Sequence, residues 1–159
     1  MPRWVVLRAV CANVDCISAC RLLGRTGTRP AMKVLFVTSE LAGLAKAGGL
    51  GDVAAGLPTA LQRLGVDVRL LLPAYRSVLA QLPQVAWIGR LPGRGSIPGC
   101  RIGEVHLPSG VTLYLVGAPA LYDREGTPYC TPDGRDWPDN DVRFARLSLA
   151  AAELARGRI

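Results

Sequence analysis

The chain has 159 residues, of which 50% are hydrophobic and 19% charged, and its formal net charge is +7. This length is enough for one domain with a real core, and the composition excludes a disordered chain. Outside residues 1–31 the basic residues form no cluster, and only 6% of residues are aromatic, so we do not expect a nucleic-acid-binding protein. No apolar run approaches the roughly 20 residues that a membrane-spanning helix needs.

Residues 1–31 differ in character from the rest of the chain. They contain five arginines and one aspartate, and Arg8, Asn13 and Asp15 interrupt the apolar stretch that a secretory signal requires. Two interpretations are open: an arginine-rich organelle presequence, or an over-extended start with Met32 as the natural first residue. The second is favoured because Met32 directly precedes the first predicted strand. We therefore predict that residues 1–31 lie outside the fold, as a disordered extension or a mis-assigned start, and that residues 32–159 form the domain.

The cysteines and the histidine do not indicate a metal site or a redox motif. The five cysteines are scattered and include no C-x-x-C pair, which is typical of free thiols in a reducing compartment such as the cytoplasm. His106, the only histidine, lies in an alternating strand pattern, where an ordinary position is favoured over a metal ligand. We predict neither a metal ion nor a cofactor.

The domain begins with a strand–helix–strand unit. Residues 33–38 and 66–72 are apolar and β-branched, as in buried strands, and the pattern between them predicts a helix over 51–64. Pro58 lacks a backbone donor, so it should kink that helix or shift its start, and Gly65 should end it. The helix face predicted to be apolar consists of Val53, Leu57, Ala60, Leu61 and Leu64. Such a unit implies an α/β fold with a mostly parallel, Rossmann-like sheet and a right-handed crossover.

Residues 46–52, Lys-Ala-Gly-Gly-Leu-Gly-Asp, lie between that first strand and the helix, and we call them the glycine-rich segment. Glycines let the backbone approach a ligand, a helix start offers unpaired N–H groups, and Lys46 adds a positive charge, so the segment suits a phosphate. A plain turn is an equally open interpretation. The segment does not match a Walker A loop, and it fits a dinucleotide fingerprint poorly because about nine residues separate Gly49 from the strand.

Asp52 has two open roles. Near the start of the helix it can cap free N–H groups, and facing a ligand it can accept a hydrogen bond from a hydroxyl. The sequence alone does not separate these roles.

The second half of the domain contains a hairpin and a long irregular stretch. Residues 85–91 suggest a strand, and 101–107 and 111–116 predict a hairpin around Pro108-Ser109-Gly110. Residues 119–138 are too long for an ordinary loop. Their Tyr122, Tyr129 and Trp137 suit stacking on sugar rings or, equally, pinning the loop to the core. A helix capped by Asp139 or Asn140 should then run to about Ala155.

Five stretches, in the same order, resemble the family of bacterial glycogen synthases and plant starch synthases. They are Met-Lys-Val-Leu-Phe-Val-Thr-Ser-Glu (32–40), the glycine-rich segment with Ala47 where the family usually has Thr, Val-Arg-Leu-Leu-Leu-Pro-Ala-Tyr (68–75), residues 121–129 and Asp-Trp-Pro-Asp-Asn (136–140). Leu57-Pro58 is a further landmark. The resemblance covers about residues 32–156, which makes 1–31 a non-family extension.

The resemblance implies the N-terminal, Rossmann-like half of a GT-B glycosyltransferase that transfers glucose from ADP-glucose to the non-reducing end of an α-1,4-glucan in glycogen or starch synthesis. It implies that Lys46, Gly48 and Gly49 contact the phosphates or glucosyl group of ADP-glucose. It also implies that Asp52 lies at the glucosyl end and Tyr129 on the acceptor-glucan side. No catalytic residue is assigned.

The chain is shorter than the synthases it resembles and lacks their His-Asp-Trp stretch and nucleotide-binding C-terminal domain. We therefore expect a truncated domain that is inactive alone, because sugar transfer needs electrostatic help for the departing diphosphate. The alternative is a stand-alone nucleotide- or glucan-binding module without catalysis.

Overall fold

The computed structural model of the chain describes residues 4–8, 32–82 and 84–157. Its first half contains the predicted strand–helix–strand unit: β2 (Lys33–Val37), α1 (Leu50–Arg63) and β3 (Asp67–Pro73). β2 and β3 pair in parallel, with Lys33 opposite Asp67 and Val37 opposite Leu71. The α/β class and the parallel unit predicted from the sequence are therefore confirmed.

The other elements complete a mixed sheet. They are β1 (Trp4–Arg8), α2 (Arg76–Gln81), β4 (Ala86–Leu91), β5 (Cys100–His106), β6 (Thr112–Gly117), α3 (Pro119–Tyr122) and α4 (Asn140–Ala155). The strand order is β1-β2-β3-β6-β5-β4. The first four strands in this order are parallel, and β5 runs antiparallel to both β6 and β4. The mostly parallel sheet and the β5–β6 hairpin agree with the sequence predictions.

The strand β1 departs from the sequence prediction. We expected residues 1–31 to lie outside the fold, yet Trp4–Arg8 pairs in parallel with the whole of β2 as the edge strand of the sheet. The physical reason is that the outer side of β2 offers a row of backbone N–H and C=O groups, which a short apolar segment satisfies. Residues 9–31 lie outside the described residues, so their disorder and the domain boundary at residue 31 remain predictions.

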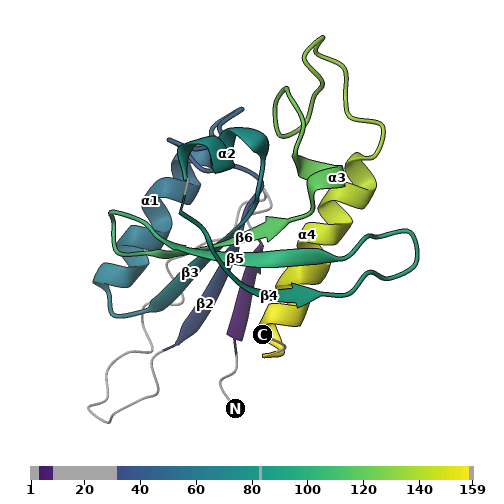
Figure 1. The fold of residues 1–159 in the computed structure, drawn as a ribbon. Coiled ribbons are helices and arrows are strands. Elements are labelled where there is room, and N and C mark those ends of the chain that lie inside the picture. The colour runs from purple at the N-terminus through teal and green to yellow at the C-terminus, as the bar shows by residue number, and fades with distance from the viewer. Residues whose placement is uncertain (1–3, 9–31, 83, 158–159) are drawn as a thin grey trace.

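Helices cover both faces of the sheet. In Figure 1, α1 lies on one side of the central strands and α4 on the other. The burial of β3 agrees, since Leu70, Leu71 and Leu72 are all buried although consecutive strand residues point to opposite faces. None of the helices in the described ranges is long and apolar enough to cross a membrane.

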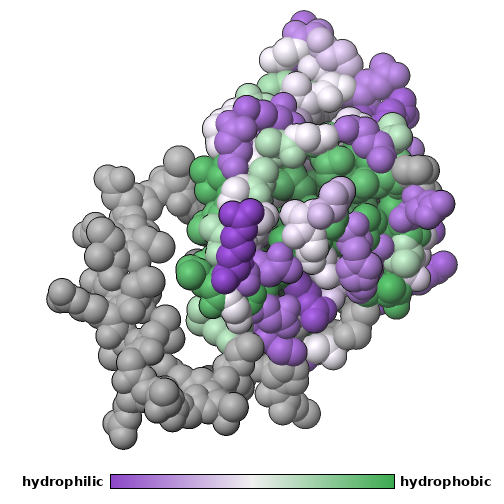
Figure 2. All heavy atoms as spheres, turned by 90° about the vertical axis from the view of Figure 1, so that its left-hand side faces the viewer, coloured by the Kyte–Doolittle hydropathy of each residue, from purple (hydrophilic) through white to green (hydrophobic). Residues whose placement is uncertain are grey.

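The helix α1 buries a different face from the predicted one. Its buried residues are Gly51, Ala54 and Pro58. Of the five residues predicted to be buried, Leu61 alone packs partly buried against the core, whereas Val53, Leu57, Ala60 and Leu64 are exposed. Small residues face the sheet and let the helix pack closely against it, so the bulkier apolar side chains point outward. Figure 2 views the molecule from the side on which α1 lies in Figure 1 and shows apolar surface there.

Pro58 does not shift the start of α1. The helix begins at Leu50 and continues through Pro58 to Arg63. A proline at this position removes the N–H that would bond to the carbonyl of Ala54, but its ring is buried against the sheet. Packing of the ring therefore offsets the missing hydrogen bond.

The helix α4 buries charge as well as apolar surface. Arg143, Arg146 and Glu153 are almost fully buried. Arg146 donates to Glu153 at 3.1 Å and to the carbonyl oxygens of Pro92 and Pro98 at 2.9 and 3.2 Å. This side chain therefore fastens the loop between β4 and β5 to α4.

Candidate functional site

The connection from β2 to α1 is a compact loop at the carboxyl end of β2. Thr38 begins it by donating its hydroxyl to the carbonyl of Glu40 at 2.7 Å. Leu41 and Ala45 then exchange two backbone hydrogen bonds of 2.8 and 2.9 Å around Gly43, whose φ is +89°. A positive φ suits glycine, so the loop closes tightly and returns the chain to Lys46 beside the helix start.

Glu40 organises the glycine-rich segment from inside this loop. The residue is only 3% exposed, and one of its carboxylate oxygens accepts the backbone N–H groups of Ala47 and Gly48 at 2.8 and 2.7 Å. The other oxygen accepts the hydroxyl of Tyr129 at 2.7 Å. Two successive N–H groups that converge on one oxygen form an anion-binding nest, and here the chain's own carboxylate occupies it.

The protonation states in this network are well defined. Burial raises the pKa of Glu40, but hydrogen bonds from Tyr129 and from the N–H groups of Ala47, Gly48 and Gly51 outweigh it, so the pKa lies below its ordinary value. Burial also raises the pKa of Tyr129 to about 12, an effect that the bond to Glu40 reinforces and the bond to Ser39 opposes. At neutral pH a charged carboxylate therefore accepts from a protonated tyrosine.

The glycines serve different purposes. The N–H of Gly48 is committed to Glu40, whereas Gly49 is the N-cap residue of α1 and has open space where a side chain would be. Gly51 is buried, and a Cβ there would lie 3.1 Å from Lys46 Cγ and 3.3 Å from the N of Ala42. Gly51 thus permits close packing of the loop on the helix, and Gly49 leaves the helix start open to a ligand.

Lys46 and Asp52 form an ion pair across the mouth of the glycine-rich segment. The amine lies 2.8 Å from both carboxylate oxygens, and the two side chains are 49% and 60% exposed. At the start of α1 no side chain makes a capping hydrogen bond, so the first role considered for Asp52 is not the observed one. An exposed pair of this kind contributes about 0–1 kcal/mol, so an incoming ligand can separate it at little cost.

The structure brings Tyr129 to the same site, although it is 77 positions from Asp52 in the sequence. Because its hydroxyl donates to Glu40, it accepts the hydroxyl of Ser39 at 2.8 Å. Its ring packs beside Phe144, with centroids 5.9 Å apart. Gly48 and Tyr129 are thus both bonded to Glu40, and Lys46 and Asp52 are paired with each other beside them, with Gly49 between these residues in the chain.

The other two aromatic residues of 119–138 pin that segment to the core. Tyr122 was considered for stacking on sugars, but it is buried and donates its hydroxyl to the carbonyl of Arg143 at 2.7 Å. Trp137 is half-buried, with the guanidinium groups of Arg124 and Arg143 at 4.9 and 5.5 Å from its ring. Arg124 also holds Asp139 through two hydrogen bonds of 2.8 and 2.7 Å. The pinning interpretation therefore holds for Tyr122.

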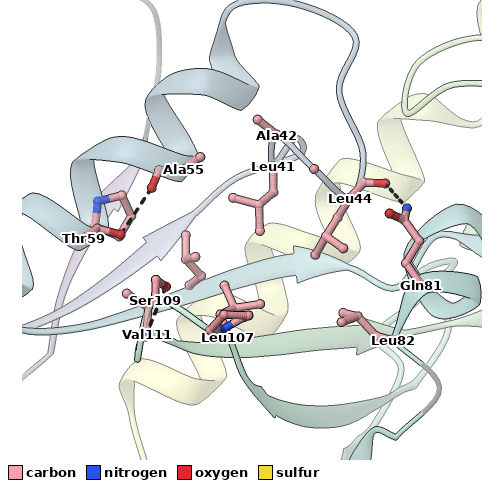
Figure 3. Close-up of a pocket in the computed structure, with 14 residues that line it drawn as sticks. Leu41, Ala42, Leu44, Ala55, Thr59, Gln81, Leu82, Leu107, Ser109 and Val111 are labelled. Atoms are coloured by element: carbon pink, nitrogen blue, oxygen red, sulfur yellow. Dashed lines mark hydrogen bonds between the residues drawn. The ribbon is translucent and has the colours of Figure 1, made fainter.

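A separate apolar cavity of about 460 Å³ lies on the other side of the same loop. Figure 3 shows Leu41 and Leu44 of the loop pointing toward Leu107 and Leu82, and Gln81 donates to the carbonyl of Leu44 at 3.0 Å. None of the five predicted site residues lines this cavity. Its lining is apolar, so it does not supply the chemistry expected of a phosphate site.

Glu40 is the functional candidate that sequence reasoning missed. The sequence contained a signal for Glu40: an acidic residue between a buried strand and a glycine-rich turn needs hydrogen-bond partners for its charge. The sequence did not reveal which backbone groups provide them.

Comparisons with known proteins give a consistent result. The starch synthase catalytic domain family matches residues 33–159. A glycogen synthase of Pseudomonas putida is 53% identical over 125 residues, which is 79% of this chain and 24% of that protein. A glycogen synthase of Pseudomonas aeruginosa is 56% identical over 126 residues, with the same coverage of 79% and 24%.

Among solved structures, the catalytic domain of starch synthase IV from Arabidopsis thaliana, bound to ADP and acarbose, matches with a TM-score of 0.61 and 28% identity. The match covers 81% of this chain and 26% of that one. These findings confirm the family resemblance noted in the sequence. The chain spans about a quarter of the length of the curated relatives it matches.

Proposed function

Because this chain belongs to the family of starch synthase catalytic domains, we propose that it forms part of a glucosyltransferase. The proposed reaction moves glucose from ADP-glucose to the non-reducing end of an α-1,4-glucan, as in glycogen or starch synthesis. The names of its relatives support this choice, since proteins at least half identical to it over this region are glycogen synthases. The relative bound to ADP and acarbose supports an ADP-linked sugar as donor and a glucan-like acceptor.

The observation that carries the proposal is the position of the glycine-rich segment. It lies after the carboxyl end of β2 and enters α1 at Leu50, with Gly49 as N-cap residue. In parallel α/β sheets ligands bind at this edge, and a helix start adds partial positive charge and free N–H groups. The exposed amine of Lys46 adds a full positive charge, so the arrangement suits a sugar diphosphate.

Each predicted site residue has a proposed task. Lys46 and the N–H of Gly49 contact the phosphates, while Gly48, whose N–H is occupied, contributes close backbone approach. Asp52 accepts a hydrogen bond from a glucosyl hydroxyl once the phosphate has drawn Lys46 away from it. Tyr129 borders the acceptor side and anchors the segment through Glu40.

We propose that this chain supplies one wall of the site and does not catalyse transfer alone. Retaining transfer needs strong stabilisation of the departing diphosphate, and one exposed lysine with a helix start is a modest source of it. ADP-glucose and an α-1,4-glucan are the proposed partners, without nucleic acid or membrane. The cytoplasm is the proposed location, and the free thiols of Cys100 and Cys130 are compatible with it.

Calorimetric titration of the whole chain with ADP-glucose tests the proposal. We expect measurable binding, and we expect Lys46→Ala to raise Kd about tenfold because it removes the only full positive charge of the glycine-rich segment. The matched control is Arg63→Ala, which removes one positive charge at the opposite, exposed end of the same helix.

Two results contradict the proposal. Equal affinity of wild type and Lys46→Ala for ADP-glucose excludes the phosphate contact. An equal loss of affinity in Lys46→Ala and Arg63→Ala would show that the effect comes from the overall charge of the chain. Binding of a glucan without ADP-glucose would favour the alternative, a stand-alone binding module.

A further inference from the structure

Glu40 carries a buried charge that the proposed ligand contacts do not use. Its side chain reaches from the loop after β2 to the nearby glycine-rich segment and to residues 119–138, which are distant in sequence. A charge with 3% exposure is costly unless hydrogen bonds compensate it. Both of its oxygens have such partners, namely Ala47, Gly48 and Tyr129.

These bonds determine which N–H groups remain for a ligand. Ala47 and Gly48 turn their N–H groups inward to Glu40, and the first residues of α1 follow directly. Within the described part of the chain, the N–H groups of Gly49 and Leu50 have no hydrogen-bond partner. The bonds of Ala47 and Gly48 to Glu40 therefore fix the backbone that directly precedes the unpaired N–H groups of Gly49 and Leu50.

We propose that Glu40 is a positioning residue that holds the glycine-rich segment in its ligand-binding shape. Its carboxylate acts as an internal anion for Ala47 and Gly48, so that Gly49, Leu50 and Lys46 face the phosphates. Tyr129 couples residues 119–138 to the same carboxylate. This inference rests on the proposed function, and it adds a residue that touches no substrate.

The ion pair of Lys46 follows from the same arrangement. A Cβ placed on Gly51 would lie 3.5 Å from Glu40 Oε2 and 3.1 Å from Lys46 Cγ, so both side chains approach α1 at this position. The carboxylate, the helix start and the lysine are thus packed together. Loss of the Glu40 carboxylate frees the backbone of Ala47 and Gly48, while α1 stays packed on the sheet.

The test uses backbone amide signals of Ala47 and Gly48 in the whole chain, measured by NMR without ligand. We expect Glu40→Ala to speed hydrogen exchange of these two amides by about tenfold or more, because their charge-assisted bonds are lost. Glu40→Gln keeps one carbonyl oxygen and should give an intermediate rate. Glu125→Ala, which removes an exposed carboxylate whose ion-pair partner among the described residues is Arg76, serves as the control.

ADP-glucose affinity supplies the second readout. We expect Glu40→Ala to weaken binding about tenfold, with partial rescue in Glu40→Gln and none of this loss in Glu125→Ala. Tyr129→Phe keeps the ring but removes the hydroxyl donor, and it should weaken binding less than Glu40→Ala. Denaturant midpoints of all variants exclude unfolding as the cause.

The outcomes are distinguishable. Unchanged amide exchange in Glu40→Ala overturns the inference, and so does altered exchange with unchanged ADP-glucose affinity, because Glu40 would then have a purely structural role. If wild type does not bind ADP-glucose, the proposed function fails, while the ligand-free exchange rates still decide whether Glu40 orders the segment.

Discussion

Glu40 and Lys46 are six residues apart, yet their charges are in opposite surroundings. Glu40 is buried and bonded through both oxygens, whereas Lys46 is half-exposed and has one weak, solvent-screened partner in Asp52. A buried charge with fixed hydrogen bonds holds a backbone in place, and an exposed one can change partners. We therefore infer that Glu40 shapes the site and that Lys46 meets the ligand.

The pKa of Glu40 makes a prediction about pH. Because the pKa is lowered in the folded chain, the stabilisation that Glu40 provides is complete above its unfolded pKa of about 4.3 and is lost as pH falls through the folded value. We expect the free energy of unfolding to drop on acidification below about pH 4.3, and to drop less in Glu40→Gln.

Urea unfolding at several pH values between 7 and 3 measures this difference. Asp139 also has a lowered pKa, owing to its hydrogen bonds with Arg124, but it contributes equally to both proteins. The difference between the two curves therefore isolates Glu40. Parallel curves over the whole range would refute the prediction.

Sequence reasoning pointed to Lys46, Gly48 and Gly49 but not to Glu40. Lys46, Gly48 and Gly49 follow a predictable strand and precede a predictable helix, so their place at the sheet edge follows from chain order. The role of Glu40 depends on a bond to Tyr129, 89 positions away, and on the closure of the loop around it. Neither is visible in local periodicity.

At the scale of elements, α4 fixes the loop between β4 and β5 through buried charge. Arg146 and Glu153 are fully buried, and Arg146 also satisfies the carbonyl oxygens of Pro92 and Pro98. Arg94 of that loop approaches the other side of Glu153, with Nε 3.6 Å from Oε1. The bonds of Arg146 to the two carbonyl groups and the contact of Arg94 with Glu153 thus connect the helix to this loop, which also closes on itself through backbone hydrogen bonds between Arg94 and Ile97.

Arg146→Ala tests this connection. It removes the buried partner of Glu153, leaving only the half-exposed Arg94 beside that carboxylate among the described residues, and it leaves two carbonyl groups without their donor, so we expect a loss of about 3–5 kcal/mol in the free energy of unfolding. Denaturant unfolding measures it, with Arg156→Ala at the exposed end of α4 as control, for which a change within about 0.5 kcal/mol is expected. Similar values for the two variants would show that the buried pair is not important for stability.

Long elements with clear periodicity were predictable, while packing details were not. The positions of β2, β3, the β5–β6 hairpin and α4 agree with the sequence prediction to within one or two residues. The face of α1 predicted to be buried was wrong except at Leu61, because the buried Gly51 and Ala54 give a weaker hydropathy signal than the exposed leucine and valine side chains. The six-residue helix α2 and the strand β1 depend on tertiary contacts, which local patterns do not encode.

At the scale of the whole molecule, the sheet gathers the candidate residues at one edge. β2 and β3 run in parallel, so the loop after β2 and Tyr75, which follows β3, emerge on the same side. Residues 119–138 begin directly after β6, which is parallel to β3, and bring Tyr129 to the same edge. Chain topology therefore brings these three segments, which are far apart in sequence, to the same edge of the sheet.

We propose that ADP-glucose binds at the glycine-rich segment, and a map of the amide shifts of the whole chain during titration with ADP-glucose tests this claim. We predict that the largest shifts fall on residues 46–52 and on Tyr129, and that the lining of the apolar cavity around Leu44 and Leu107 stays unchanged. Shifts confined to that cavity, or the absence of any shift at residues 46–52 at saturating ligand, would contradict the claim.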